Sequence, residues 1–158
     1  MNDQTRIRVA LIETKYGKRG ARAGTEAELT AERARRFDED FKRARAEILA
    51  PTLGEIGAAL TEAGHGHRVE IDAGEHRPSI ELYLLLGDNA SVSAGVIRLF
   101  SRTTEAYGSE IIAEVQLKRT LVELTRFHEA SALTREVVEQ MVVDAVEQVF
   151  AYHSSSER

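Results

Sequence analysis

The histidines in the middle of the chain are the residues whose spacing could support metal chemistry. His65 and His67 form an HxH pair, and Asp72, Glu75 and His76 follow shortly afterwards. Side chains at positions i and i+2 of a β-strand share a face and can chelate one metal ion. However, the glycines on both sides of His65 predict a turn, and a third ligand at a fixed spacing is missing. We therefore expect neither a metal site nor a cofactor.

Three further patterns resemble catalytic or nucleotide-binding motifs in composition alone. The glycine-rich segment 17–24 lacks both the GxGxxG and the GxxxxGK[ST] spacing, and Ser91 and Ser93 lie outside any GxSxG motif. Glu81 and Glu114 can become neighbours on a sheet and form an acid–base pair, but glutamates on strands are more often solvated surface residues. The chain has no Cys, which excludes thiolate nucleophiles and Cys-ligated metals. We predict no catalytic residue, and an enzymatic role is less favoured than a non-enzymatic one.

The first 24 residues form a basic arm on an otherwise acidic chain. The arm holds six cations against two carboxylates, a net charge of +4, and the whole chain carries −5, so residues 25–158 carry −9. Such an arm can contact about four to six phosphates in a salt-sensitive way, although nucleic-acid-binding domains usually have a pI above about 9. It can equally bind the acidic body, in the same chain or in a neighbouring subunit. The candidate polyanion-binding residues are Arg6, Arg8, Lys15, Lys18, Arg19 and Arg22.

The composition is typical of one soluble globular domain. The chain has 158 residues, of which 42% are hydrophobic and 30% charged. No run approaches the ~18–20 consecutive apolar residues of a membrane helix, and the first residues lack a signal-peptide pattern. We therefore expect a cytoplasmic protein without membrane contact.

The elements that must position these residues begin with the basic arm. Residues 6–13 alternate weakly and could form a short edge strand, so segment 1–24 is predicted to be either flexible or a short strand. Thr25, with Glu28 three residues later, forms a capping-box pattern that predicts the start of a long helix. Pro51 predicts either a kink near residues 47–51 or a second helix that has Pro51 in its first turn. Gly64 then ends the helical region.

A run of strands follows, and a last helix closes the domain. Thr134 caps this helix, which we expect to reach about residue 152, followed by a disordered tail over residues 153–158. The fifth apolar segment, 120–127, is either a strand or the start of a helix. The predicted strands are residues 67–72, 79–86, 96–102, 109–118 and, in the first alternative, 120–127.

Short connections between these strands predict an antiparallel meander of four or five strands. Both helices, the long kinked N-terminal one and the C-terminal one, have an apolar stripe that can cover one face of the sheet. Residues 25–152 are therefore expected to form a single two-layer α+β domain, a layout that suggests a small bacterial protein.

The second face of the sheet is predicted to be unusually apolar for a solvated surface. A homo-oligomer contact, a segment of the same chain such as the arm, or a ligand or different protein could cover it. The predicted interaction surface consists of Tyr83, Leu85, Val96, Arg98, Phe100 and Ile112.

The first hypothesis for function is accordingly a non-enzymatic protein-interaction module, a homo-oligomer acting as an adaptor or accessory subunit. The alternatives are nucleic-acid or polyanion binding through the arm, and a small-ligand or enzymatic pocket between helix and sheet.

Overall fold

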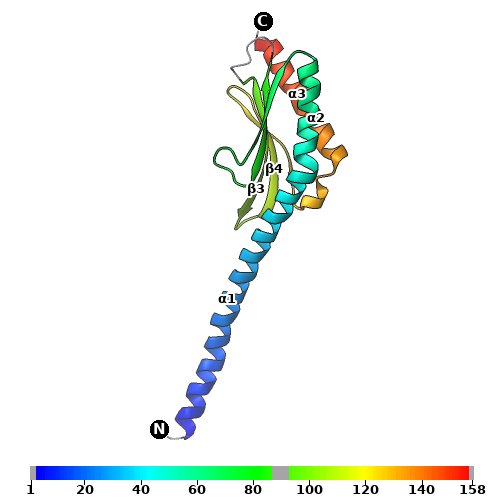
Figure 1. The fold of residues 1–158 in the computed structure, drawn as a ribbon. Coiled ribbons are helices and arrows are strands. Elements are labelled where there is room, and N and C mark those ends of the chain that lie inside the picture. Colours follow the sequence, from blue (N-terminus) through cyan, green and yellow to red (C-terminus); the bar gives the residue numbers. More distant parts are fainter. Residues whose placement is uncertain (1–2, 87–92, 157–158) are drawn as a thin grey trace. The chain divides into compact units, whose positions relative to one another are not determined.

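The computed structural model describes residues 3–86 and 93–156, and for residues 9–24 and 156 it describes the backbone alone (Figure 1). Met1–Arg36 and Phe37–Arg158 are two separate structural units. The second unit contains the sheet and the helices that cover it. Ser91, which was considered in the sequence analysis, lies outside the described residues.

The helical region before the sheet consists of three segments. Helix α1 spans Asp3–Ala44, a π-helical turn η1 spans Arg45–Leu49, and helix α2 spans Ala50–Glu62. Pro51 lies in the first turn of α2, where its missing N–H costs no helical hydrogen bond. The predicted interruption at the proline is therefore confirmed. Gly64 has a φ of 95°, which confirms its role as the residue that ends α2.

The prediction of an edge strand over residues 6–13 is wrong, because these residues belong to α1. Thr25 is also not a helix cap, since it lies within the same helix. The weak alternation of residues 6–13 gave no strand because β-propensity depends on a neighbouring strand, whereas a helix pairs its backbone groups locally.

The sheet is an antiparallel meander with the strand order β1-β2-β3-β4-β5. This confirms the predicted topology, and it decides that the segment predicted at residues 120–127 is a strand, β5, rather than the start of a helix. A β-bulge interrupts the pairing of β4 with β5 near Ala113 and Glu114. The strands are β1 Gly66–Ile71, β2 Ser79–Leu85, β3 Gly95–Thr104, β4 Gly108–Gln116 and β5 Leu121–Phe127.

The core lies between one face of this sheet and the helices α2 and α3, which Figure 1 draws on the same side. Helix α3 spans Arg135–Ser156 and follows a short 3-10 helix, Ala130–Ala132. The fold is therefore the predicted two-layer α+β arrangement. The largest fully buried apolar side chains are Phe41, Leu49, Leu53, Ile80, Leu82, Leu84, Ile97, Leu99, Ile111 and Val115.

The sequence predicted the start of α3 correctly and its end incorrectly. Thr134 caps the helix as expected, because its Oγ1 accepts a hydrogen bond from the Val137 N–H at 3.3 Å. The tail prediction is wrong for residues 153–156, which continue the helix. His153 gives this last turn a contact, since its Nε2 lies 3.0 Å from the Ala94 carbonyl oxygen.

Candidate interaction surfaces

The six residues of the predicted interaction surface share the sheet face that α2 and α3 leave uncovered. The sheet register places Tyr83 opposite Val96 and Phe100 opposite Ile112. Three of the apolar side chains are nevertheless buried within this one chain, because Val96 is 9%, Phe100 3% and Ile112 3% exposed. Tyr83, Leu85 and Arg98 are half-buried.

Part of the cover over this face comes from the connection between β1 and β2. The ring of His76 stacks on Phe100, with the centroids 3.8 Å apart and the planes 12° from parallel. A segment of the same chain therefore covers part of the face, which was one of the three kinds of cover considered from the sequence. The partner-binding role of the remaining surface stays a prediction.

An ion-pair network across β2, β3 and β4 fills the middle of the same face. Arg98 donates from Nε to Glu81 at 2.8 Å and from Nη1 to Glu114 at 3.0 Å. Both carboxylates are buried, with Glu81 2% and Glu114 8% exposed. The two glutamates that the sequence suggested as neighbours thus lie on either side of Arg98. One guanidinium therefore links carboxylates on β2 and β4 across β3.

Tyr83 extends this network toward β1. Its hydroxyl donates to Glu81 Oε2 at 2.5 Å, and this hydrogen bond, together with burial, raises the pKa of Tyr83 to about 12. The guanidinium of Arg68 lies 4.4 Å from the centre of the Tyr83 ring. Tyr83 therefore remains protonated at neutral pH and acts as a hydrogen-bond donor.

A second network joins β3, β4 and β5 around Glu110, which is 1% exposed. Arg102 donates to this carboxylate at 2.7 Å and Arg126 at 3.3 Å. The hydrogen bond from Arg102 is the main cause that lowers the pKa of Glu110 below its ordinary value of 4.5, and the charge of Arg126 adds to it. Glu110 is therefore ionised in the folded protein at neutral pH.

We expect Glu110→Gln to lower the free energy of unfolding by about 1–3 kcal/mol at pH 7, because charge-assisted hydrogen bonds to a buried group are lost. The folded-state pKa of Glu110 is lowered, so its contribution is complete above pH 4.5 and disappears as pH falls through the folded value. Urea unfolding of both proteins at pH 7 and at decreasing acidic pH measures this. A difference in stability that does not shrink in acid would contradict the assignment.

The candidate metal ligands do not converge on one point. The His67 ring lies 2.8 Å from the Thr61 hydroxyl, the His65 ring meets Phe150 edge-on at 5.0 Å, and His76 stacks on Phe100 as described above. Within residues 3–86 and 93–156 there is no group of three His, Cys, Asp or Glu side chains that could hold a metal ion.

Asp72 instead anchors the π-helical turn to the sheet. Arg45 of η1 donates to Asp72 Oδ1 at 2.7 Å and to the Ser79 carbonyl oxygen at 3.0 Å. The Ser79 N–H donates to the same carboxylate oxygen at 2.9 Å. Although burial opposes the shift, these hydrogen bonds lower the pKa of Asp72. One ion pair therefore joins η1 to the loop end of the β1–β2 hairpin.

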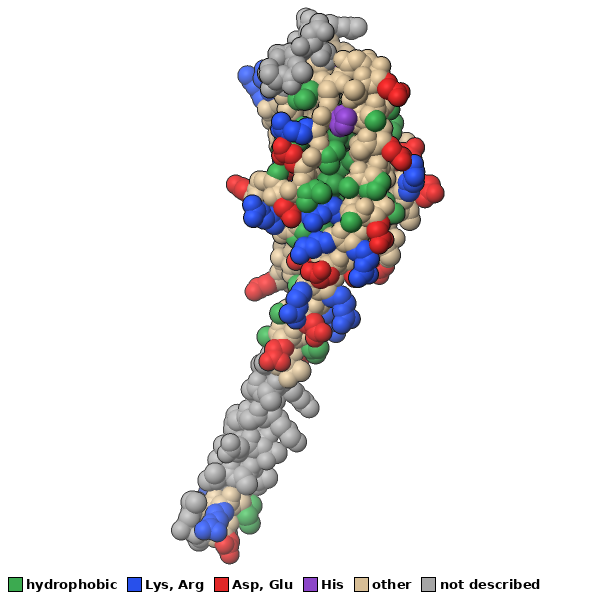
Figure 2. Space-filling model, in the orientation of Figure 1, with side chains coloured by type: hydrophobic (Ala, Val, Ile, Leu, Met, Phe, Trp, Pro, Cys, Tyr) green, Lys and Arg blue, Asp and Glu red, His purple; other side chains and the backbone are tan. Residues whose placement is uncertain are grey.

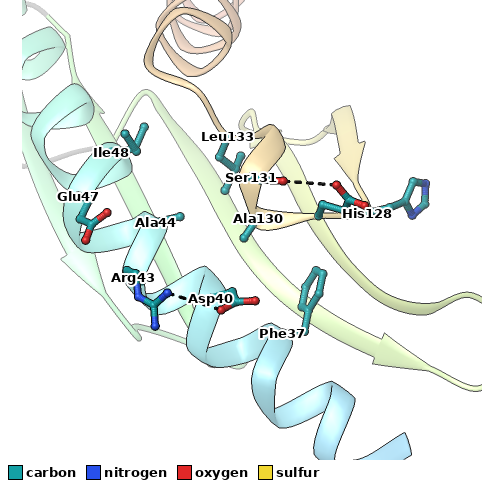
Figure 3. Close-up of a pocket in the computed structure, with 11 residues that line it drawn as sticks. Phe37, Asp40, Arg43, Ala44, Glu47, Ile48, His128, Ala130, Ser131 and Leu133 are labelled. Carbon is teal, nitrogen blue, oxygen red and sulfur yellow. Dashed lines mark hydrogen bonds and ion pairs between the residues drawn. The ribbon is translucent and has the colours of Figure 1, made fainter.

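A groove of about 490 Å³ lies beside this π-helical turn, and Figure 3 shows its lining. One wall is formed by the end of α1 and by η1, and the other by the segment after β5. π-Helical turns occur frequently at functional sites, so the groove is the leading concave candidate. Its apolar lining is Phe37, Ala44, Ile48, Ala130 and Leu133, and its polar lining is Asp40, Arg43, Glu47, His128, Glu129 and Ser131.

The sequence did not reveal this groove, because its walls come from segments about 90 positions apart along the chain. Neither wall carries a known motif. The sequence analysis also did not predict the cross-strand ion pairs. A signal for them was present, since Glu81, Arg98 and Glu114 alternate in sign on outward-facing positions of consecutive strands.

The candidate polyanion-binding residues all belong to α1. Arg6 and Arg8 are exposed, and Ile7 between them is 60% exposed. Lys15, Lys18, Arg19 and Arg22 lie in the part of α1 where the structure describes only the backbone.

No protein-family model matches this chain, and neither a curated protein nor a solved structure resembles it significantly. In the part of the chain that the structure describes, no helix has the length and apolarity needed to cross a membrane.

Proposed function

We propose that this chain is a non-enzymatic interaction module that associates with a second copy of itself, and that the N-terminal part of α1 makes the contact. It would act as an adaptor or accessory subunit, in which the two-layer domain is the stable scaffold.

The observation that carries the proposal is the exposure of the side chains that the structure describes on both sides of residues 9–24 (Figure 2). Side chains 3–8 and 25–33 are exposed, including Leu29 at 45%. Helices in proteins gain most of their stability by packing an apolar face against another surface. This helix also contains Gly17, Gly20 and Gly24, each of which costs about 1 kcal/mol relative to alanine in a helix interior. A partner surface would supply the missing stabilisation.

Charge supports a second copy as the partner. Residues 1–24 carry +4 and residues 25–158 carry −9, so the basic segment of one copy is attracted to the acidic body of another. Such complementarity raises association rates and selects the partner, and it weakens as salt increases.

Amide hydrogen exchange at two protein concentrations tests the proposal. Residues 3–36 should exchange more slowly at the higher concentration, because association buries and stabilises the helix, whereas strands β2 to β4 should exchange equally slowly at both. If residues 3–36 exchange at the same rate at both concentrations, a second copy does not stabilise the helix and the proposal is wrong.

Polyanion binding is the second candidate, and the exposed Arg6 and Arg8 favour it. If it is correct, the chain binds a DNA duplex at low salt, and Arg6→Gln/Arg8→Gln reduces both the affinity and the salt dependence. Loss of DNA binding in this variant, with self-association unchanged, would favour this candidate over the first.

A further inference from the structure

The groove beside η1 combines an apolar floor with an acidic rim. We call its larger apolar lining residues the floor: Phe37, Ile48 and Leu133 (Figure 3). We call its charged lining residues the rim: Asp40, Arg43, Glu47 and Glu129. Nη1 of Arg43 lies 3.9 Å from Oδ1 of Asp40, so these two opposite charges offset each other. Glu47 and Glu129 are exposed and remain as net negative charge. A matching ligand would present an apolar group flanked by cations.

The start of α1 has this chemistry. Ile7 is 60% exposed, and Arg6 and Arg8 on either side of it in sequence are exposed as well. An isoleucine can fill an apolar floor of this kind, while a guanidinium can form hydrogen-bonded ion pairs with carboxylates at the rim.

We infer that the groove beside η1 is the docking site for the Arg6–Ile7–Arg8 segment of a second copy. The inference rests on the proposed function and gives it a location. In a symmetric pair each copy supplies one segment and one groove, so two equivalent contacts form at once. The segment of one copy then gains the packing that an isolated polar helix lacks.

A charge-exchange experiment tests the inference with full-length chains. The segment variant is Arg6→Glu/Arg8→Glu, and the groove variant is Glu47→Lys/Glu129→Lys. The four substituted side chains are all exposed in the unmodified chain. Fluorescence-detected sedimentation velocity measures the association of labelled protein. Each variant alone should associate at least about 10-fold more weakly than the unmodified chain, because like charges then face each other.

An equimolar mixture of the two variants should recover association, because opposite charges then meet in both contacts. The acidic segment of the segment variant faces the basic groove of the groove variant, and the unchanged basic segment of the groove variant faces the unchanged acidic groove of the segment variant. Glu105→Lys changes an exposed carboxylate in the turn between β3 and β4 and serves as the matched control, which should associate like the unmodified chain. Circular dichroism establishes that all variants are folded.

The possible failures are distinguishable. If the unmodified chain associates but the groove variant does so equally well, or the mixture does not recover, the groove is not the docking site and the proposed function survives. If the unmodified chain does not associate at all, both the proposed function and this inference fail.

Discussion

Arg98→Met is expected to lower the free energy of unfolding by about 3–5 kcal/mol, because it removes the cationic partner of a buried ion pair and leaves the carboxylates unpaired. The guanidinium of Arg98 is the shared partner of Glu81 and Glu114, whose side chains are 3% and 10% exposed. Methionine preserves much of the side-chain volume but leaves two carboxylates in the sheet without their cation. Urea unfolding followed by circular dichroism measures the loss.

Arg135→Met is the matched control, because Arg135 also pairs with two carboxylates, Glu55 and Glu139, but all three side chains are more than half exposed. Exposed ion pairs are worth at most about 1 kcal/mol, so this variant should remain close to the unmodified chain. Adding Glu81→Gln and Glu114→Gln to Arg98→Met should recover part of the loss by removing the unpaired charges. Equal losses for Arg98→Met and Arg135→Met would contradict the buried network.

Gly57→Ala and Gly54→Ala are expected to change stability in opposite directions, although both lie in α2. A Cβ at Gly57 would stand 2.2 Å from Cδ2 and 2.6 Å from Cγ of His67, which is closer than these atoms can approach. A Cβ at Gly54 meets no atom within 4 Å. Alanine at position 54 should therefore stabilise the protein by about 0.5–1 kcal/mol through helix propensity. Alanine at position 57 should destabilise it by about 1–3 kcal/mol through overpacking.

A double variant separates the clash from other effects of the alanine at position 57. Because the clash involves the His67 ring, Gly57→Ala in a His67→Ala background should cost much less than Gly57→Ala alone. The same urea unfolding experiment applies to all of these proteins. A stabilising Gly57→Ala would mean that α2 and β1 do not approach each other as closely as described.

The arrangement of the second unit could be predicted from the sequence because local signals agreed with one another. Alternating apolar residues predicted the strands, short connections made them antiparallel, and Pro51 and Gly64 marked where helical segments begin and end. The error over residues 6–13 arose where the local signal was weakest. A few β-branched residues do not form a strand when no neighbouring strand is present.

The candidate sites were harder to predict, because they depend on contacts between distant segments. The outward positions of Phe100 and Ile112 followed from strand alternation, but their burial depends on what covers them, and His76 reaches Phe100 from the connection before β2. The groove beside η1 needs both the π-helical turn and the segment after β5. Neither the register of a π-helical turn nor the path of a loop follows from apolar periodicity.

The mass of the full chain in solution is the most direct test of the proposed self-association. Sedimentation equilibrium over concentrations from about 1 μM to several hundred μM detects dimers with dissociation constants in the same range, which includes weak, transient association. The proposal predicts a mass that rises from the 17.5 kDa of one chain toward twice that value. A mass that stays at 17.5 kDa over the whole range would contradict it.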